Sequence, residues 1–225
     1  MFNLIRGWLG EKKTRLNLWV SLNSQIYRKF HDLYIPTFSG TAQIDHLIIS
    51  QYGLFIVETK NIKGWIFGDE SAHQWTQLIY GNKYRFQNPL RQTYRQKKAL
   101  AAYLNIDDNL IQPIVYFAGD CQFKTYMPTN VINGRLRHSI KSYRKAILSE
   151  QEVSYLISKV ENHQINSKTT NREHVKGLRE RYKSTTICPK CGSPLVKRVA
   201  RTGVNAGSYF WGCDSFPKCR YIKNK

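Results

Sequence analysis

The spacing of apolar residues changes from helical to alternating within the first third of the chain. Between residues 8 and 30 large apolar side chains recur every three or four positions, which predicts one helix over 8–30. A short strand is expected at 33–36. Two runs rich in Ile, Val, Leu and Phe follow, "QIDHLIIS" at 43–50 and "LFIVETK" at 54–60, separated by a "QYG" turn. This arrangement predicts a β-hairpin with a buried face.

The next hundred residues mix strand patterns with two well-marked helix starts. Asn88 and Pro89 are a typical N-cap and first helical residue, so we expect a helix that ends near Leu104. Ser149 and Glu152 form a capping box, which predicts a helix over roughly 150–162. Further strands are expected at 65–67, 75–80, 83–86 and 111–119, with a tight turn at Gly81-Asn82.

These alternating strands and helices predict an α/β fold. A chain of 225 residues is long enough for one good core and a small module. The stretch 163–186 is polar and basic, as is typical of a linker. We therefore expect a main domain at 1–162, a linker at 163–186 and a small C-terminal unit at 187–225.

A formal net charge of +20 is the feature of the composition that bears on function. Such an excess favours a polyanionic partner, either nucleic acid or an anionic membrane surface, although it can also serve solubility alone. Residues 166–225 carry 14 Lys and Arg against 3 Asp and Glu. No apolar run approaches the roughly 18 residues that span a bilayer, and the start does not fit a secretory signal. We expect no membrane partner and a cytoplasmic location.

Four of the five cysteines lie in the last 38 residues, in two pairs. In a chain without an export signal, such pairs are more typical of metal ligands than of disulfides, although free or disulfide-bonded cysteines are the alternative. Four thiolates suit a closed, tetrahedral, structural Zn²⁺ site, and a unit of this size needs the metal to fold. The fifth, Cys121, is expected to be a buried thiol. The predicted zinc ligands are Cys188, Cys191, Cys213 and Cys219.

The segments "CPKCGSPLVKR" and "FWGCDSFPKC" resemble the C4 zinc ribbons at the C-terminus of bacterial type IA topoisomerases. The resemblance covers roughly residues 187–222 and implies binding to DNA, mainly single-stranded. Basic side chains there can meet phosphates and aromatic ones can stack on bases, although one or two aromatics are expected to pack inside the ribbon. The expected nucleic-acid contacts are Lys197, Arg198, Arg201, Tyr209, Trp211, Lys218 and Arg220.

Charged residues interrupt the apolar hairpin at one end. Strand alternation puts Glu58 and Lys60 on the same face, and pairing across the hairpin turn would set Asp45 near Glu58. Two adjacent carboxylates repel unless a cation lies between them, and a nearby lysine can stabilise the charge that builds on a phosphate. This constellation suits a Mg²⁺-dependent phosphodiesterase. Taken alone, the Glu-x-Lys pattern favours an ordinary Glu–Lys surface pair at a strand end.

The order of the blocks "GTAQIDHLIISQYGLFIVETKNIKG", Trp75 and "NPLRQ" resembles the nuclease-related domain, NERD, a branch of the PD-(D/E)XK nuclease superfamily. The resemblance covers roughly residues 8–125 and implies a restriction-endonuclease-like α/β fold, in which a mixed sheet is flanked by helices. It also implies that Asp45 and Glu58 bind Mg²⁺ or Mn²⁺, that Glu11 is a further acidic ligand, and that Lys60 is the catalytic lysine. Gln92 corresponds to a glutamine that helps hold metal or substrate, and Gln96 shares its helical face. The chain departs from the superfamily pattern at Ile44, where proline is common.

We therefore expect a metal-dependent nuclease that cleaves DNA, held on its substrate by a zinc ribbon, in DNA processing, repair or phage defence. The alternatives are a non-enzymatic DNA-binding protein on a nuclease scaffold and a nuclease directed at RNA. The sequence does not separate these substrates, because both nucleic acids present phosphates and stackable bases.

Overall fold

The computed structural model describes residues 14, 21–37, 40–166, 176, 180, 186–189, 193–217 and 219–223. The chain divides into two compact units. The larger comprises residues 1–35 and 43–167, and the smaller comprises residues 36–42 and 168–225. The predicted limits 1–162, 163–186 and 187–225 remain predictions.

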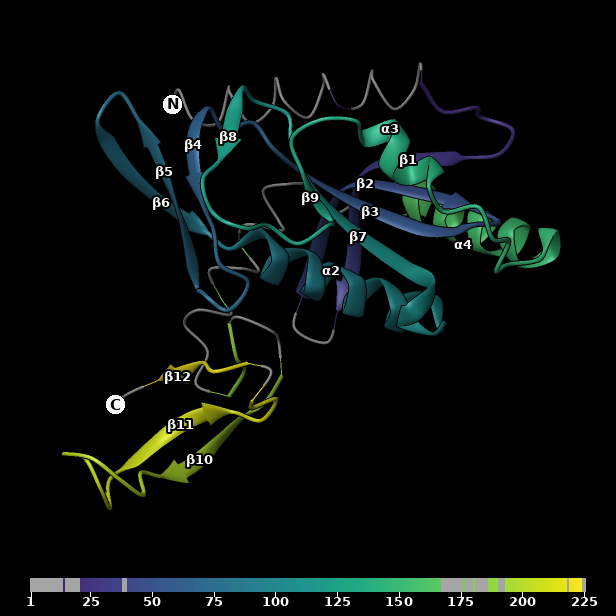
Figure 1. Ribbon diagram of the computed structural model, residues 1–225. Helices are drawn as coiled ribbons and strands as arrows, with labels where there is room; N and C mark the ends of the chain where they lie inside the picture. The colour runs from purple at the N-terminus through teal and green to yellow at the C-terminus, as the bar shows by residue number, and fades with distance from the viewer. Residues whose placement is uncertain are drawn as a thin grey trace. The chain divides into compact units, whose positions relative to one another are not determined.

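The larger unit is built on a mixed five-stranded sheet. Its strand order is β1 (Arg28–Thr37), β2 (Gly40–Ser50), β3 (Gly53–Lys60), β7 (Ile111–Phe117) and β9 (Val131–Ile132) (Figure 1). The strands β2 and β3 form the expected antiparallel hairpin, whereas β7 pairs with β3 in parallel. A parallel neighbour requires a crossover connection, and the segment between β3 and β7 contains helix α2 (Pro89–Leu104) and the 3₁₀ turn η1 (Asp108–Leu110).

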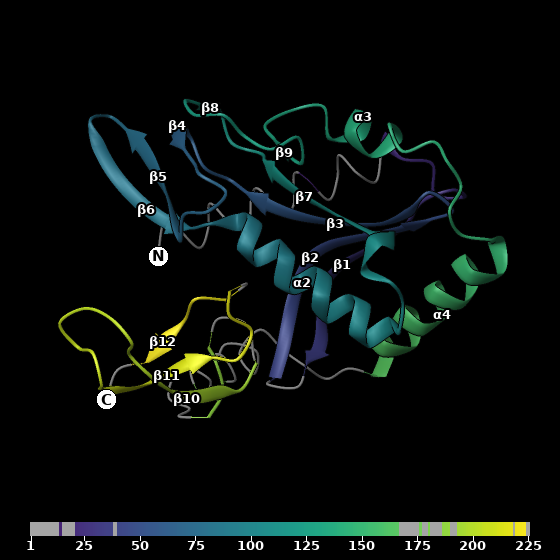
Figure 2. The same cartoon turned by 60° about the horizontal axis from the view of Figure 1, so that its bottom comes forward.

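Helices cover both faces of this sheet, and the alternation of β3 decides which side chains meet them. Leu54 and Ile56 belong to the core with residues of α2 and α4 (Glu150–Asn166). Phe55 and Val57 point the other way and share a core with residues of α3 (Leu136–Lys141). Figure 2 shows α2 and α4 on one side of the sheet and α3 on the other. The expected mixed α/β fold is confirmed.

A second, four-stranded sheet extends from the same unit. Its order is β6 (Asn82–Gln87), β5 (Gln74–Ile79), β4 (Gly64–Phe67) and β8 (Cys121–Phe123). One face packs through Ile66 and Trp75 against Phe117 of β7. The β5–β6 turn has positive φ at Tyr80 and Gly81, so it lies one residue earlier than predicted.

The smaller unit contains a three-stranded antiparallel sheet. Strand β11 (Tyr209–Cys213) pairs with both β10 (Leu195–Val199) and β12 (Ile222–Lys223).

Most predicted elements are confirmed, and one is wrong at its end. The helix expected over 8–30 extends too far, because residues 22–27 form a turn and β1 begins at Arg28. Of the expected helix before them, only residues 14 and 21 are described, both helical, and the remainder lies outside the described residues. The caps at Asn88 and Ser149 are confirmed, since Asn88 accepts a hydrogen bond from the Leu90 amide and Ser149 exchanges bonds with Glu152. The short elements β8, β9 and α3 were not predicted.

Candidate functional site

Glu58 and Lys60 lie at the carboxyl end of β3, on the face shared with Leu54 and Ile56. Glu58 is only 2% exposed, and the Lys60 side chain is 22% exposed. Lys60 Nζ donates to Glu58 Oε1 at 2.5 Å. An ordinary surface ion pair does not fit a glutamate buried to this degree. The hairpin therefore ends in a charged pair inside the protein, where a bare carboxylate is costly.

Asp45 lies on the neighbouring strand β2 and is 7% exposed. It precedes His46, which pairs with Val57, so the antiparallel register continues towards Asp45 opposite Glu58. Asp45 Oδ2 accepts a hydrogen bond from the Thr59 amide at 3.0 Å. The carboxylate is thus fastened to the backbone of β3 between Glu58 and Lys60.

Helix α2 contributes two glutamines to the same place. The Asn88 cap and Pro89 fix the start of the helix. Gln92 and Gln96 lie one turn apart and share a face. Gln92 Oε1 accepts a hydrogen bond from Lys60 Nζ at 3.0 Å. Gln96 Nε2 donates to Glu58 Oε2 at 2.8 Å, so the glutamate has a partner on each carboxylate oxygen.

The residues of this cluster fit a hard divalent cation. Buried carboxylates and amide oxygens are the ligands that Mg²⁺ and Mn²⁺ prefer. Gln96 is 3% exposed, and its Oε1 is a buried oxygen with no hydrogen-bond partner. A cation near Glu58 would give this oxygen a partner and would offset the cost of burying two carboxylates.

The structure thus brings together four of the five predicted site residues: Asp45, Glu58, Lys60 and Gln92. The fifth, Glu11, lies outside the described residues. Gln96 was placed on the right helical face but was not assigned a role. Its spacing of four from Gln92 is the signal that marks it, and its bond to Glu58 makes it part of the network.

The cysteines of the smaller unit form a second centre. The Sγ atoms of Cys188, Cys213 and Cys219 all lie within 4.8 Å of one another, and the three residues are buried. Cys188 Sγ is 3.7 Å from Cys219 Sγ, far beyond the roughly 2.05 Å of a disulfide. Tetrahedral zinc with bonds of about 2.3 Å sets its sulfurs roughly 3.8 Å apart. The cluster therefore fits structural Zn²⁺. The predicted fourth ligand, Cys191, lies outside the described residues.

The predicted nucleic-acid residues of the ribbon divide between its two faces. Lys197 pairs with Trp211 across β10 and β11, and its Nζ lies 4.0 Å from the centre of the Tyr209 ring. Arg198 points to the opposite face, beside Gly212, where a groove of about 700 Å³ lies. The groove is basic and aromatic, and its lining includes Arg198, Arg201, Phe210, Phe216, Arg220 and Tyr221. Lys218 lies outside the described residues.

Comparison with known proteins shows the family of this chain. Residues 6–118 match the family of nuclease-related domains, NERD. The chain belongs to this family. A similar relative is an uncharacterized protein of Bacillus anthracis, 32% identical over 183 residues, which cover 79% of this chain and 85% of that protein. The catalytic residues of the nuclease-related domain and its dependence on metal remain predictions.

The C-terminal segment has its own match. Residues 185–225 match the DNA-binding C4 zinc finger of topoisomerases. DNA topoisomerase 1 of Helicobacter pylori is 46% identical over 41 residues, which are 18% of this chain and 5% of that enzyme. No solved structure matches the chain. The chain therefore joins a nuclease-related domain to a topoisomerase-type ribbon.

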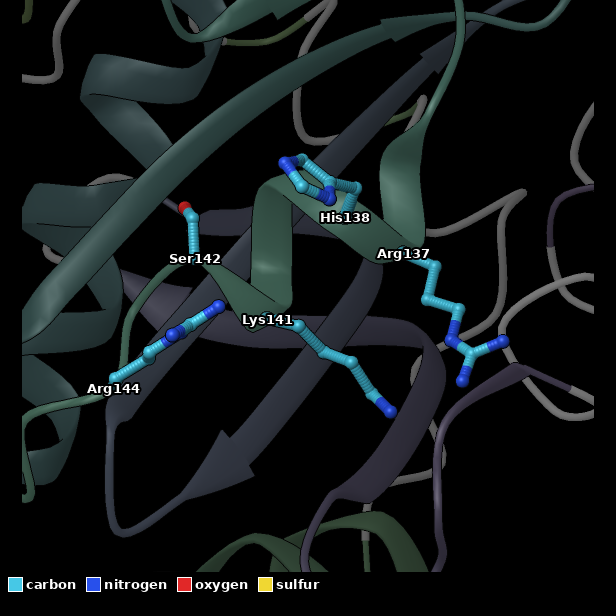
Figure 3. Close-up of a pocket in the computed structure, with 5 residues that line it drawn as sticks. All are labelled: Arg137, His138, Lys141, Ser142 and Arg144. Atoms are coloured by element: carbon cyan, nitrogen blue, oxygen red, sulfur yellow. The ribbon is translucent and has the colours of Figure 1, made fainter.

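The nuclease-related unit also carries a pocket of about 600 Å³ beside α3. Its lining holds four basic residues and one serine (Figure 3). Arg137 and Lys141, one helical turn apart, point to the same side of α3 (Figure 3). None of the four basic residues forms an ion pair with another described residue. The pocket is lined by Arg137, His138, Lys141, Ser142 and Arg144.

None of the described helices is both long and apolar enough to cross a membrane.

Proposed function

We propose that this protein is a metal-dependent nuclease that cleaves phosphodiester bonds in DNA. The observation that supports it is the buried hydrogen-bond network around Glu58. Glu58 accepts hydrogen bonds from Lys60 and Gln96, and Asp45 accepts one from the adjacent Thr59 amide. A fold gains little stability from two buried carboxylates and a lysine, because their desolvation is costly. Such a cluster is more typical of a catalytic site, where charged groups are arranged in advance of the reaction.

Asp45 and Glu58 would hold Mg²⁺ or Mn²⁺, with Glu11 as a further acidic ligand. When bound, the cation supplies Lewis acidity at a phosphate oxygen and a more acidic water. Gln96 fixes the orientation of Glu58 through its hydrogen bond, so the carboxylate needs little rearrangement to bind the ion.

Lys60 carries the remaining chemistry in this proposal. Water adds to phosphorus, one ester P–O bond breaks, and a proton from that water ends on the leaving oxygen as an alcohol. Negative charge increases on the phosphoryl oxygens during this step. The Lys60 ammonium stabilises that charge, while Gln92 holds the lysine side chain through its 3.0 Å hydrogen bond. Both side chains are partly exposed, so an incoming phosphate can reach them.

The rest of the chain would hold the substrate. The ribbon at 187–225 binds DNA, including single strands, through cations and aromatic side chains. The basic linker at 163–186 and the pocket beside α3 add phosphate contacts. A thiolate zinc centre is typical of a reducing compartment. The location in this proposal is the cytoplasm, and the role is DNA processing, repair or phage defence.

The test is incubation of the purified protein with linear duplex, circular duplex, single-stranded DNA and RNA, each with Mg²⁺, Mn²⁺ or EDTA. The proposal expects cleavage of DNA with either metal and none with EDTA. Cleavage of RNA alone would support the RNA-directed alternative. Tight binding of DNA without cleavage under any metal would support a non-enzymatic DNA-binding protein instead.

A further inference from the structure

The four-stranded sheet of the nuclease-related unit leaves one face exposed, and that face carries two large aromatic rings. Trp65 and Phe67 on β4 are 47% and 36% exposed. Ile66 between them is fully buried and packs in the core on the other side. Side chains of this size are normally buried in a soluble protein, so two on one exposed strand face mark a contact surface.

Strand register shows which side chains surround the rings. Trp65 lies beside Leu78, which pairs with Lys83, and Phe67 lies beside Thr76, which pairs with Arg85. Directly paired residues share a face of a sheet, so both cations lie on the same face as the rings, one strand beyond Leu78 and Thr76. On the other side Lys124 Nζ lies 4.4 Å from the centre of the Trp65 ring. We call this surface the aromatic face: Trp65, Phe67, Leu78, Lys83, Arg85 and Lys124.

The charge of the aromatic face is of one sign. The strands β4, β5, β6 and β8 contain no Asp or Glu. Lys83, Arg85 and Lys124 are exposed, and none forms an ion pair within the described part of the chain. Rings flanked by unpaired cations suit a partner that offers both planar apolar groups and negative charge. Nucleic acid offers both, through its bases and its phosphates.

The spacing of the rings favours single strands. Residues two apart on one strand face are separated by roughly 7 Å. Successive bases in one strand of a duplex are only about 3.4 Å apart. Bases that stack on both Trp65 and Phe67 must therefore be spread from one another, which a duplex does not allow. A base on Trp65 would take the place of the Lys124 ammonium, which remains close enough to meet a phosphate.

The aromatic face is also fixed relative to the candidate catalytic cluster. Strand β4 begins four residues after Lys60, and β6 ends just before the α2 cap that leads to Gln92. The Asn88 side chain donates to the carbonyls of Asp69, Glu70 and Ala72, which ties the β4–β5 connection to the start of α2. A nucleic-acid strand bound on this face is therefore held by the same compact unit that carries the carboxylates.

We propose that the aromatic face is a stacking platform for unpaired bases of single-stranded nucleic acid. This deepens the proposed function by naming the form of the substrate. The chemistry is common to single-stranded DNA and RNA, because stacking uses the base ring and not the sugar.

The test measures binding by fluorescence anisotropy with no Mg²⁺ or Mn²⁺ added and without a chelator, so that it does not depend on cleavage and the ribbon keeps its zinc. The full chain is compared with a variant carrying Trp65→Ala and Phe67→Ala. Tyr84→Ala is the matched control, since Tyr84 lies on the opposite face of the same sheet and is 54% exposed. The probes are a thymidine 12-mer, a uridine 12-mer, a 12-base-pair duplex, and a 12-mer with tetrahydrofuran in place of each base.

The double variant should bind the thymidine or the uridine 12-mer at least about tenfold more weakly, as expected for lost stacking on two rings. Its affinity for the duplex and for the base-free strand should change less than twofold, and Tyr84→Ala should match the wild type. Equal losses on all four probes, or no loss on either single strand, would overturn the proposal. The latter result would indicate a protein partner for this face.

A second measurement keeps the ribbon from masking the result. A thymidine 12-mer with one 5-iodouracil is irradiated with the full chain, and the crosslinked peptides are identified by mass spectrometry. Crosslinks at Trp65 or Phe67 support the platform, whereas crosslinks confined to residues 187–225 would overturn it. A protein that crosslinks at these rings but cleaves no nucleic acid would refute the nuclease proposal and leave this one standing.

Discussion

Replacing Gln96 with leucine tests whether the buried network holds Glu58 in place. Gln96 Nε2 donates to Glu58 Oε2 at 2.8 Å and to the Gln43 carbonyl at 2.9 Å. A hydrogen bond to a charged group contributes about 1.5–3 kcal/mol, and a neutral one about 0.5–1.5 kcal/mol. Leucine has a similar volume but no donor. We therefore expect the free energy of unfolding of the larger unit to fall by about 2–4.5 kcal/mol.

The assay is urea denaturation in EDTA, followed by circular dichroism and tryptophan fluorescence. Gln77→Leu is the matched control, because Gln77 Nε2 also donates to a backbone carbonyl, that of Lys63 at 2.7 Å, but in an exposed position. It should lose less than about 1 kcal/mol, since water replaces an exposed partner. A loss for Gln96→Leu no larger than that of Gln77→Leu would refute the reasoning, because Glu58 would then not depend on this bond.

Three further predictions concern the other charged and thiol groups. A chain of residues 1–186 should bind DNA more weakly and with a flatter salt dependence, whereas its single-turnover cleavage at saturating DNA should change little. Filter binding across a salt series checks this. An unchanged dependence of affinity on salt would assign the ribbon to a protein partner. Zinc chelation should make the four ribbon thiols reactive to Ellman's reagent at pH 8. Cys121 should not react in the folded unit, because burial, and to a lesser extent the nearby Asp120 charge, raises the pKa of its thiol to about 11. A fifth thiol that reacts rapidly with the reagent would contradict this. Replacing both Arg137 and Lys141 with alanine should make the plot of log affinity against log salt concentration less steep, by about 1.8 for duplex DNA. Lys145→Ala, outside the pocket, should leave this slope unchanged. Equal effects would mean that the pocket binds no phosphate.

The sequence predicted those helices and turns whose ends are set by residues close together in the chain. The start of α2 follows from Asn88 and Pro89, because an Asn side chain caps the first amides and Pro suits the first turn. The helix expected over 8–30 was too long because Tyr27 and Phe30 continue the helical spacing of apolar residues. In the structure Phe30 lies in β1 and Tyr27 just before it. Asn23 is the overlooked stop signal, since its side chain accepts from the Gln25 amide and its carbonyl from the Tyr27 amide.

Features that depend on distant pairing were not predictable in this way. The network around Glu58 needs α2 to cross the end of β3, and the sequence shows only that Gln92 and Gln96 share a face. The aromatic face needs β8 to pair with β4 across more than fifty residues, which no local pattern reveals. The ribbon is the opposite case, because cysteine spacing alone indicates a zinc site.

The central claim, that the buried cluster is catalytic, is tested most directly by single-turnover cleavage of Lys60→Ala beside Lys63→Ala. Lys63 is three residues further along the chain, is exposed, and has no side-chain bond to the cluster in the described structure. With DNA saturating and Mg²⁺ present, Lys60→Ala should cleave at least about 100-fold more slowly, since removing one such donor typically costs 10²–10³ in rate. Lys63→Ala should cleave at the wild-type rate. A Lys60→Ala protein that cleaves as fast as the wild type would contradict the account and place the chemistry elsewhere.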